Sequence, residues 1–186
     1  MTDPGILNLH AFLPQSYANG PGSRAVVWFQ GCTLNCDGCF NPATHSGKPN
    51  ILKSPADLAN DILIFKNIEG ISISGGEPFD QAEGLAAFLQ TIRNSSKLTI
   101  ILFSGYTFEK ILEMTEGEEI LKNIDVLIAG PFDKSKLLPE NLAGSSNKTY
   151  HFFTEKYSFG DFEKIPDAEI IIEPSGKVTW SGIQQF

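Results

Sequence analysis

Arg24-Ala-Val-Val-Trp-Phe-Gln-Gly-Cys-Thr-Leu-Asn-Cys-Asp-Gly-Cys-Phe-Asn41 is the stretch from which the fold of this sequence is predicted. Its first seven residues form a near-continuous apolar run, which is the pattern of a strand buried on both faces of a parallel sheet. The loop that follows holds all three cysteines of the chain, spaced C-x3-C-x2-C. Thiolates are soft ligands that suit zinc or iron–sulfur clusters. The sequence therefore predicts a metal centre at the carboxyl end of a buried strand.

Segments with strand and helix patterns alternate along the chain. Strands are predicted over residues 6–13, 24–30, 70–74, 98–104 and 124–129, and helices over 54–67, 80–95, 107–114 and 116–122. The first helix has the clearest start, because Ser54 is a good N-cap and Pro55 suits the first helical position. This alternation predicts an α/β domain with a parallel sheet and right-handed crossovers.

Chemically distinctive residues lie at the carboxyl ends of four successive predicted strands. They are Cys32, Gly75-Gly76-Glu77, Ser104-Gly105-Tyr106 and Gly130-Pro131. Because sites in parallel α/β structures gather beyond the carboxyl ends of the strands, we expect these four groups to converge. The stretch 31–53 shows no periodic pattern, and a long loop of this kind inside a compact domain is usually functional.

The C-terminal third has a weaker pattern. Residues 150–153 fit a strand, and residues 168–173 and 177–180 fit two strands joined at Pro174-Ser175-Gly176, which predicts a C-terminal β-hairpin. No linker, internal repeat or low-complexity tract interrupts the sequence. A single domain spanning residues 1–186 is therefore predicted.

The composition narrows the class of protein. Hydrophobic residues make up 41% of the 186 positions, which is enough for a globular core, and the net charge of −8 argues against a nucleic-acid-binding surface. The first residues lack the pattern of a signal peptide, and the longest apolar runs fall far short of a membrane span. Three cysteines in one loop fit a metal site and not a disulfide framework. We therefore expect a cytoplasmic protein that binds neither nucleic acid nor membrane.

The cysteine spacing resembles the cluster loop of the radical S-adenosylmethionine (SAM) superfamily. Gly20-Pro21-Gly22-Ser23-Arg24 resembles the Gly-Pro-Gly-x-Arg run of glycyl-radical activases, and Gly38-Cys39-Phe40-Asn41 resembles the activating enzyme of anaerobic (class III) ribonucleotide reductase. The resemblance implies a partial, open parallel (β/α) barrel. It also implies a [4Fe-4S] cluster held by Cys32, Cys36 and Cys39, with SAM bound to the iron that lacks a protein ligand.

The resemblance extends to the predicted cofactor-binding residues. Gly75, Gly76 and Glu77 match the Gly-Gly-Glu motif that receives the methionine ammonium group of SAM, and the family implies cofactor contacts for Ser104, Asp125 and Asn147. Each motif also has a structural interpretation: a strand-to-helix turn, a helix cap at Thr107, a buried strand or a surface loop. For Arg24 a structural salt bridge is the favoured role. The chain departs from the family pattern at Asn19, Ala129 and Lys148, where the family has an aspartate, an acidic residue and a glutamine.

The activity implied by the resemblance is that of an oxidoreductase. Such an enzyme cleaves SAM reductively at its cluster to a 5′-deoxyadenosyl radical and generates a glycyl radical on a partner such as anaerobic ribonucleotide reductase. A flavodoxin- or ferredoxin-type protein would donate the electron. Two alternatives stay open: the same radical chemistry on a peptide or small metabolite, and a non-catalytic zinc or iron–sulfur binding module in which His45 completes a Cys3His site.

Overall fold

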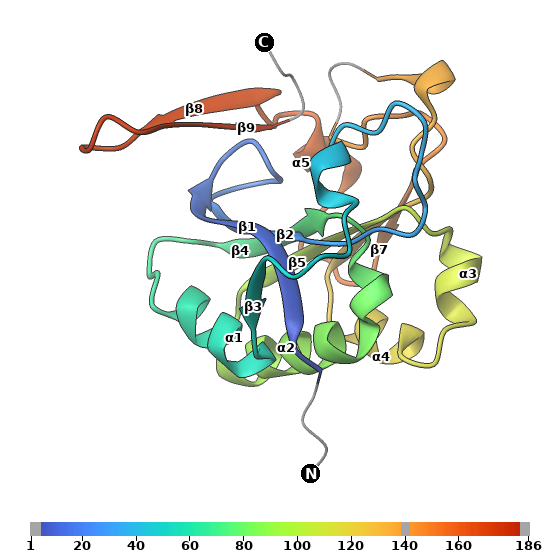
Figure 1. Cartoon of the computed structure of the whole chain (residues 1–186), viewed down its shortest axis with the longest axis horizontal. Coiled ribbons are helices and arrows are strands. Elements are labelled where there is room, and N and C mark those ends of the chain that lie inside the picture. The colour runs from blue at the N-terminus through green and yellow to red at the C-terminus, as the bar shows by residue number, and fades with distance from the viewer. Residues whose placement is uncertain (1–4, 139–141, 183–186) are drawn as a thin grey trace.

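The computed structural model describes residues 5–138 and 142–182, and its centre is a seven-stranded sheet (Figure 1). The strand order is β3-β1-β2-β4-β5-β6-β7, so the sheet is open in the part of the chain described. Its strands are β1 Leu7–Ser16, β2 Arg24–Phe29, β3 Ile51–Lys53, β4 Gly70–Gly75, β5 Thr99–Ser104, β6 Val126–Ala129 and β7 Thr149–Phe152.

The sheet is mixed, with a parallel centre. Strands β2, β4, β5 and β6 pair in parallel, whereas β1, β3 and β7 are antiparallel to their neighbours. The register places Phe29 beside Gly75 and Ser104 beside Ala129, so the carboxyl ends of the four parallel strands share one edge. That edge is where the distinctive residues were expected to meet. A partial (β/α) barrel of the radical SAM type stays a prediction.

Short helices connect the strands. The structure contains α1 Pro55–Leu63, α2 Ala82–Ser95, α3 Phe108–Leu112, α4 Gly117–Lys122 and α5 Phe159–Phe162, with 3-10 turns at Pro42–Thr44, Pro78–Gln81 and Lys134–Lys136. The predicted start of α1 is confirmed, because the Ser54 side chain accepts a hydrogen bond from the Asp57 backbone N–H. Across the described ranges, no helix has the length and apolar character needed to span a membrane.

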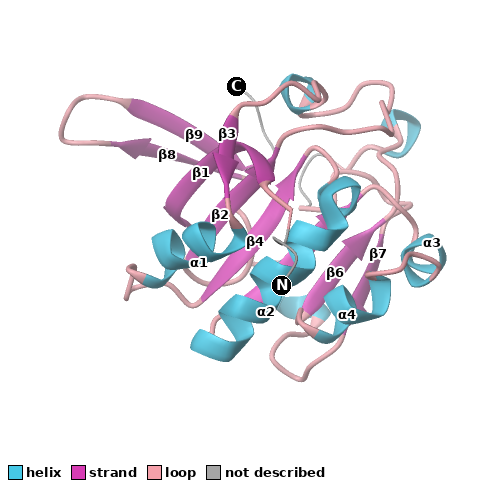
Figure 2. Cartoon of the chain, turned by 60° about the horizontal axis from the view of Figure 1, so that its bottom comes forward, coloured by secondary structure: helices cyan, strands magenta, loops and turns pink. Residues whose placement is uncertain are grey.

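The two faces of the sheet are covered differently. Helices α1, α2 and α4 lie against one face, where the main core includes Val27, Ile73 and Leu102 (Figure 2). On the opposite face the C-terminal segment packs over Ile101 and Ile128 in a second, smaller core. Ser72 and Ser74 of β4 are on this second face as well, and they line a cavity there.

Several elements differ from the predictions in extent or were not predicted. Strand β1 runs to Ser16, three residues beyond its predicted end. Strand β3 lies within the stretch 31–53, which was predicted to lack regular structure; it pairs with β1 over three residues, too few for a periodic pattern. The four-residue helix α5 was missed for the same reason. Helix α1 ends at Leu63, four residues earlier than expected.

The predicted C-terminal hairpin is confirmed. Strands β8 Ala168–Ile172 and β9 Val178–Gly182 pair antiparallel and extend away from the seven-stranded sheet (Figure 1). The hairpin is fastened at its base, where the Asn19 side chain donates to the Ser181 hydroxyl over 2.6 Å. The strand predicted over residues 150–153 is also confirmed, shifted by one residue as β7.

Arg24 does not form the predicted salt bridge. Its side chain is fully buried, and within the described residues it donates only to uncharged oxygens. These acceptors belong to Pro21, Ile71, Ser72, Thr99 and Tyr157, at distances from 2.8 to 3.1 Å. Burial lowers the pKa of Arg24, but six hydrogen bonds stabilise its charged form. The residue therefore joins the amino-terminal ends of β2, β4 and β5.

Replacing Arg24 with methionine should lower the free energy of unfolding by about 3 kcal/mol, because buried acceptors lose their donors. Urea denaturation of the two proteins would measure this difference. Lys122→Met removes an exposed cation and should change stability by less than about 0.5 kcal/mol. Equal stability of Arg24→Met and the wild type would contradict this role.

Candidate functional site

One cavity at the carboxyl edge of the parallel strands brings together most of the predicted site residues. Its lining includes Cys32, Cys36, Cys39, Gly75, Gly76, Glu77 and Ser104. Trp28 and Ser74 on neighbouring strands also line it, and Phe40, Gly144 and Lys148 line it from loops. Three of the four expected strand ends therefore converge on one space. At the fourth, Phe132 lines the cavity instead of the predicted Gly130-Pro131 pair.

The Gly75-Gly76 turn contacts the cysteine loop through backbone atoms. Gly76 donates its N–H to the Phe29 carbonyl over 2.8 Å, and Glu77 donates to the Gly31 carbonyl over 2.9 Å. A Cβ atom at Gly76 would lie 2.0 Å from the Gly31 oxygen, and Gly75 has a positive φ of 108°. Side chains are excluded at both positions. The two glycines thus allow close approach to the start of the cysteine loop, a role that the sequence motif alone did not reveal.

Asp80 fixes the first part of the cysteine loop, and sequence reasoning missed it. Its carboxylate accepts hydrogen bonds from the Thr33 backbone N–H over 2.8 Å and from the Tyr106 hydroxyl over 2.9 Å. The Thr33 hydroxyl donates to the same carboxylate over 3.1 Å. Charge-assisted hydrogen bonds of this type are stronger than neutral ones. The position of Asp80 three residues after Glu77 was the available signal.

The second part of the loop packs against the segment that follows β6. The rings of Phe40 and Phe132 lie 4.7 Å apart between centroids, and Asp37 forms an ion pair with Lys134. A Cβ atom at Gly144 would meet the Phe40 ring at 2.6 Å. These contacts hold Cys36 and Cys39 between the strand ends and the loop around residue 144.

The donor set of the three cysteines fits an iron–sulfur cluster. All three thiols are free and half-buried, and they line the same cavity. Burial raises the pKa of the Cys32 thiol, and hydrogen bonds from the backbone N–H groups of Leu34 and Asn35 partly oppose this rise. Within the described ranges, no three His, Cys, Asp or Glu side chains are arranged to hold a single metal ion. A cubane needs a wider triangle of thiolates, since each binds a different iron.

Glu77 is a fully buried carboxylate that joins the ends of β4 and β5. Its oxygens accept from the N–H groups of Phe79 and Gly105, over 3.0 and 2.7 Å, and from the Ser104 hydroxyl over 2.9 Å. Burial raises the pKa of Glu77 to about 7, although these hydrogen bonds favour its charged form. Ser104 therefore touches the cavity and at the same time holds Glu77 in place.

Three polar side-chain atoms at or near the cavity have no hydrogen-bond partner among the described residues. His45 Nε2 and Asn147 Oδ1 are buried without a partner there, and the Lys148 ammonium makes neither a hydrogen bond nor an ion pair with them. Asn147 is not among the lining residues; its amide donates to the Pro131 carbonyl over 2.8 Å, next in sequence to the lining residues Phe132 and Lys148. Burial lowers the pKa of Lys148, whereas nearby Glu77, Cys36 and Cys39 act to raise it.

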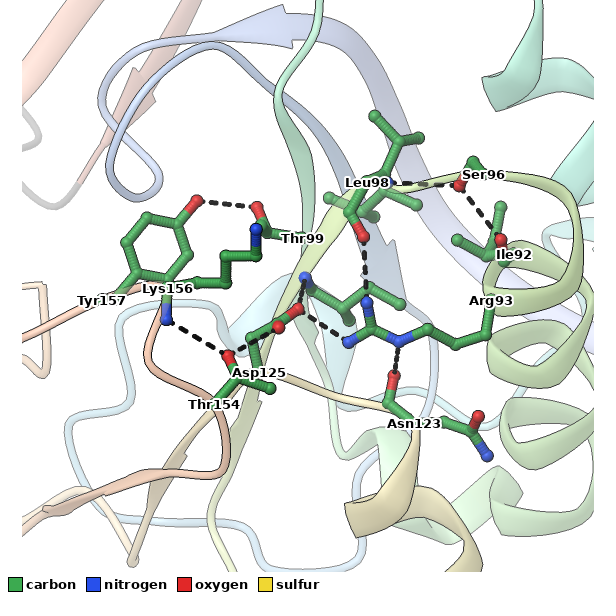
Figure 3. Close-up of polar contacts among 12 residues, drawn as sticks. Ile92, Arg93, Ser96, Leu98, Thr99, Asn123, Asp125, Thr154, Lys156 and Tyr157 are labelled. Atoms are coloured by element: carbon green, nitrogen blue, oxygen red, sulfur yellow. Dashed lines mark hydrogen bonds and ion pairs between the residues drawn. The ribbon is translucent and has the colours of Figure 1, made fainter.

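Asp125 does not face the cavity, so the predicted cofactor contact is wrong. It lies just before β6, at the opposite edge of the sheet, and its carboxylate forms a 2.6 Å ion pair with Arg93 (Figure 3). The same carboxylate accepts from the Ile100 N–H over 2.7 Å and from the Thr154 hydroxyl over 2.8 Å. The physical reason is that an acid at a strand's amino-terminal end cannot reach ligands bound beyond its carboxyl end.

A comparison with known protein families agrees with this cavity. The sequence model of the 4Fe-4S single cluster domain matches residues 18–151, which include the three cysteines and the Gly-Gly-Glu turn. The chain therefore belongs to the 4Fe-4S single cluster domain family.

More specific similarity comes from individual relatives. The chain is 31% identical to the anaerobic ribonucleoside-triphosphate reductase-activating protein of Vibrio cholerae, over 80% of this chain and 99% of the relative. It is 30% identical to the protein of that name from Escherichia coli, over 78% of this chain and 98% of the relative. The protein from Pasteurella multocida is 29% identical over 80% of this chain and 99% of its own length. These relatives support placement in the activase group.

Gly76→Ala should lower cluster affinity by about 10- to 100-fold, the range for disturbing the support of metal ligands, because its Cβ would displace the Gly31 carbonyl. Iron and sulfide analysis after anaerobic reconstitution would measure this. Gly47→Ala is the matched control, since a Cβ there meets nothing within 4 Å. Wild-type cluster content in Gly76→Ala would contradict the proposed support.

Asp125→Asn should lower the free energy of unfolding by about 2 kcal/mol, because the Arg93 pair and the Ile100 acceptor are weakened. Its iron and sulfide content at a temperature where it remains folded should equal that of the wild type. Loss of the cluster without loss of stability would restore a role for Asp125 in the cavity.

Proposed function

We propose that this chain is a radical SAM enzyme that activates a glycyl-radical partner, most specifically an anaerobic ribonucleotide reductase. The observation that carries the proposal is the cavity in which three free cysteines, the Gly75-Gly76-Glu77 turn and Ser104 meet at one edge of the sheet. The relatives named for activating anaerobic ribonucleoside-triphosphate reductase support the choice of partner.

The three cysteines would be the ligands of the cluster. Cys32, Cys36 and Cys39 would hold a [4Fe-4S] cluster through three of its irons and leave the fourth open. When bound there, the cluster and SAM would supply one-electron cleavage of the S–C5′ bond, which gives methionine and a 5′-deoxyadenosyl radical able to take a hydrogen atom from a glycine.

The walls of the cavity would position the ligand and exclude water. The carbonyls of the Gly75-Gly76 turn, and Glu77, are the acceptors proposed for the methionine ammonium group. Ser104 fixes the Glu77 carboxylate from the next strand. Asn147 holds the Pro131 carbonyl and keeps one buried oxygen unpartnered within the described residues, which suits a hydroxyl-bearing ligand such as the adenosine ribose.

Protein reconstituted with iron and sulfide without oxygen should convert SAM to 5′-deoxyadenosine when dithionite is added. Cys36→Ala should give no product, because it removes one of three ligands. Mass spectrometry of the nucleoside would measure both. A clustered wild-type protein that yields no product would favour a non-catalytic binding module, and tightly bound zinc in place of a cluster would end the proposal.

The partner needs a second readout. Electron paramagnetic resonance of a mixture with an anaerobic ribonucleotide reductase should show a glycyl radical that depends on SAM and on Cys36. Production of 5′-deoxyadenosine without that signal would leave the radical chemistry intact and redirect the search to a peptide or a small metabolite.

A further inference from the structure

We propose that Lys148 binds the α-carboxylate of SAM in this cavity, an inference that rests on the proposed function. Lys148 lines the cavity with the three cysteines and Glu77. The sequence stands apart from the resembled activases here, because they carry a neutral glutamine where this chain has a cation.

The ammonium group of Lys148 makes no hydrogen bond and no ion pair with the described residues. It is half-buried, and no carboxylate of the described residues forms an ion pair with it. Glu77, Cys36 and Cys39 are its charged neighbours, but none of them forms an ion pair with it, and the two thiols are expected to bind the cluster. A charged group removed from water requires compensation, so an anion brought in by the ligand is favoured.

The charges of SAM determine which of its groups Lys148 can receive. The molecule carries a positive sulfonium, a positive ammonium group and one negative α-carboxylate. Lys148 repels the first two and attracts only the third. With Glu77 and the Gly75-Gly76 carbonyls as the acceptors for the ammonium group, the cavity then presents both partners that an amino-acid zwitterion needs.

This arrangement would orient the ligand as well as bind it. Only the amino-acid end of SAM carries a cation and an anion side by side. A cavity that offers both hydrogen-bond acceptors and a lysine therefore selects that end. Phe40, Phe132 and Leu142 line other parts of the cavity and suit the apolar faces of the nucleoside. A glutamine can donate one neutral hydrogen bond to the carboxylate but contributes no charge.

The test compares two ligands on the reconstituted protein without reductant, so that no turnover occurs. Equilibrium dialysis would give Kd values for SAM and for decarboxylated SAM, which keeps the nucleoside, sulfonium and amine. Lys148→Gln should raise the Kd for SAM about tenfold, the equivalent of one charge-assisted hydrogen bond, and that for decarboxylated SAM less than about twofold. Lys136→Gln makes the same charge change outside the cavity lining and should alter neither Kd.

Lys148→Arg keeps the cation and should preserve the wild-type preference for SAM over its decarboxylated form. If Lys148→Gln fails to hold a cluster, the Arg variant decides alone, and a Kd raised equally for both ligands in it would overturn the inference. Equal weakening of both ligands would also overturn it, because Lys148 would then act on the cluster or the cavity in general. An unchanged Kd for SAM in Lys148→Gln would have the same consequence. Absence of SAM binding by the clustered wild type would instead overturn the proposed function, and this inference with it.

Discussion

The contact between the Gly75-Gly76 turn and the start of the cysteine loop is the constraint on which the site depends. The Gly31 carbonyl accepts from Glu77, and no Cβ atom fits at Gly76 beside that oxygen. Parallel pairing of β2 with β4 continues through Phe29 and Gly75 up to this point. The position of the first cysteine is therefore fixed by the sheet itself. A loop of this length would otherwise sample many arrangements, at an entropic cost to any ligand that orders it.

The buried Glu77 carboxylate extends this constraint from β4 to β5. Glu77 has no exposed surface, and its carboxylate is held by groups from the turn after β4 and from the end of β5. Because a carboxylate in this setting is costly unless it is hydrogen-bonded, the ends of β4 and β5 must stay together. Asp80 then connects the same turn to Thr33 and Tyr106. Two acids three residues apart thus support the site: Glu77 lines the cavity, and Asp80 holds the start of the cysteine loop.

The sequence predicted those parts of the site that depend on strand order and spacing. Cys32, Glu77 and Ser104 meet because each lies at or just beyond the carboxyl end of a parallel strand, and the buried apolar runs identified those strands. The prediction for Asp125 was wrong because it rested on a resemblance in sequence, whereas the residue lies just before β6, at the end of the sheet away from the cavity. Lys148 and Asp80 were not assigned to the site from sequence, since their roles depend on contacts between loops, which periodicity does not encode. The prediction of a salt bridge for Arg24 was wrong because the guanidinium donates to neutral oxygens, and no sequence pattern indicates such acceptors.

The C-terminal segment beyond the family match is integral to the fold and not an appended arm. About four-fifths of this chain accounts for nearly the whole length of its relatives, and the family match ends at residue 151. Yet Thr154 completes the Asp125 network, and Tyr157 accepts a hydrogen bond from the buried Arg24. Further on, Ser181 is joined to Asn19, and Gly182 lines the functional cavity. The segment thus stabilises the amino-terminal edge of the sheet and closes part of the carboxyl-terminal edge. This chain's stability and the shape of its cavity are therefore coupled through residues that lie beyond the family match.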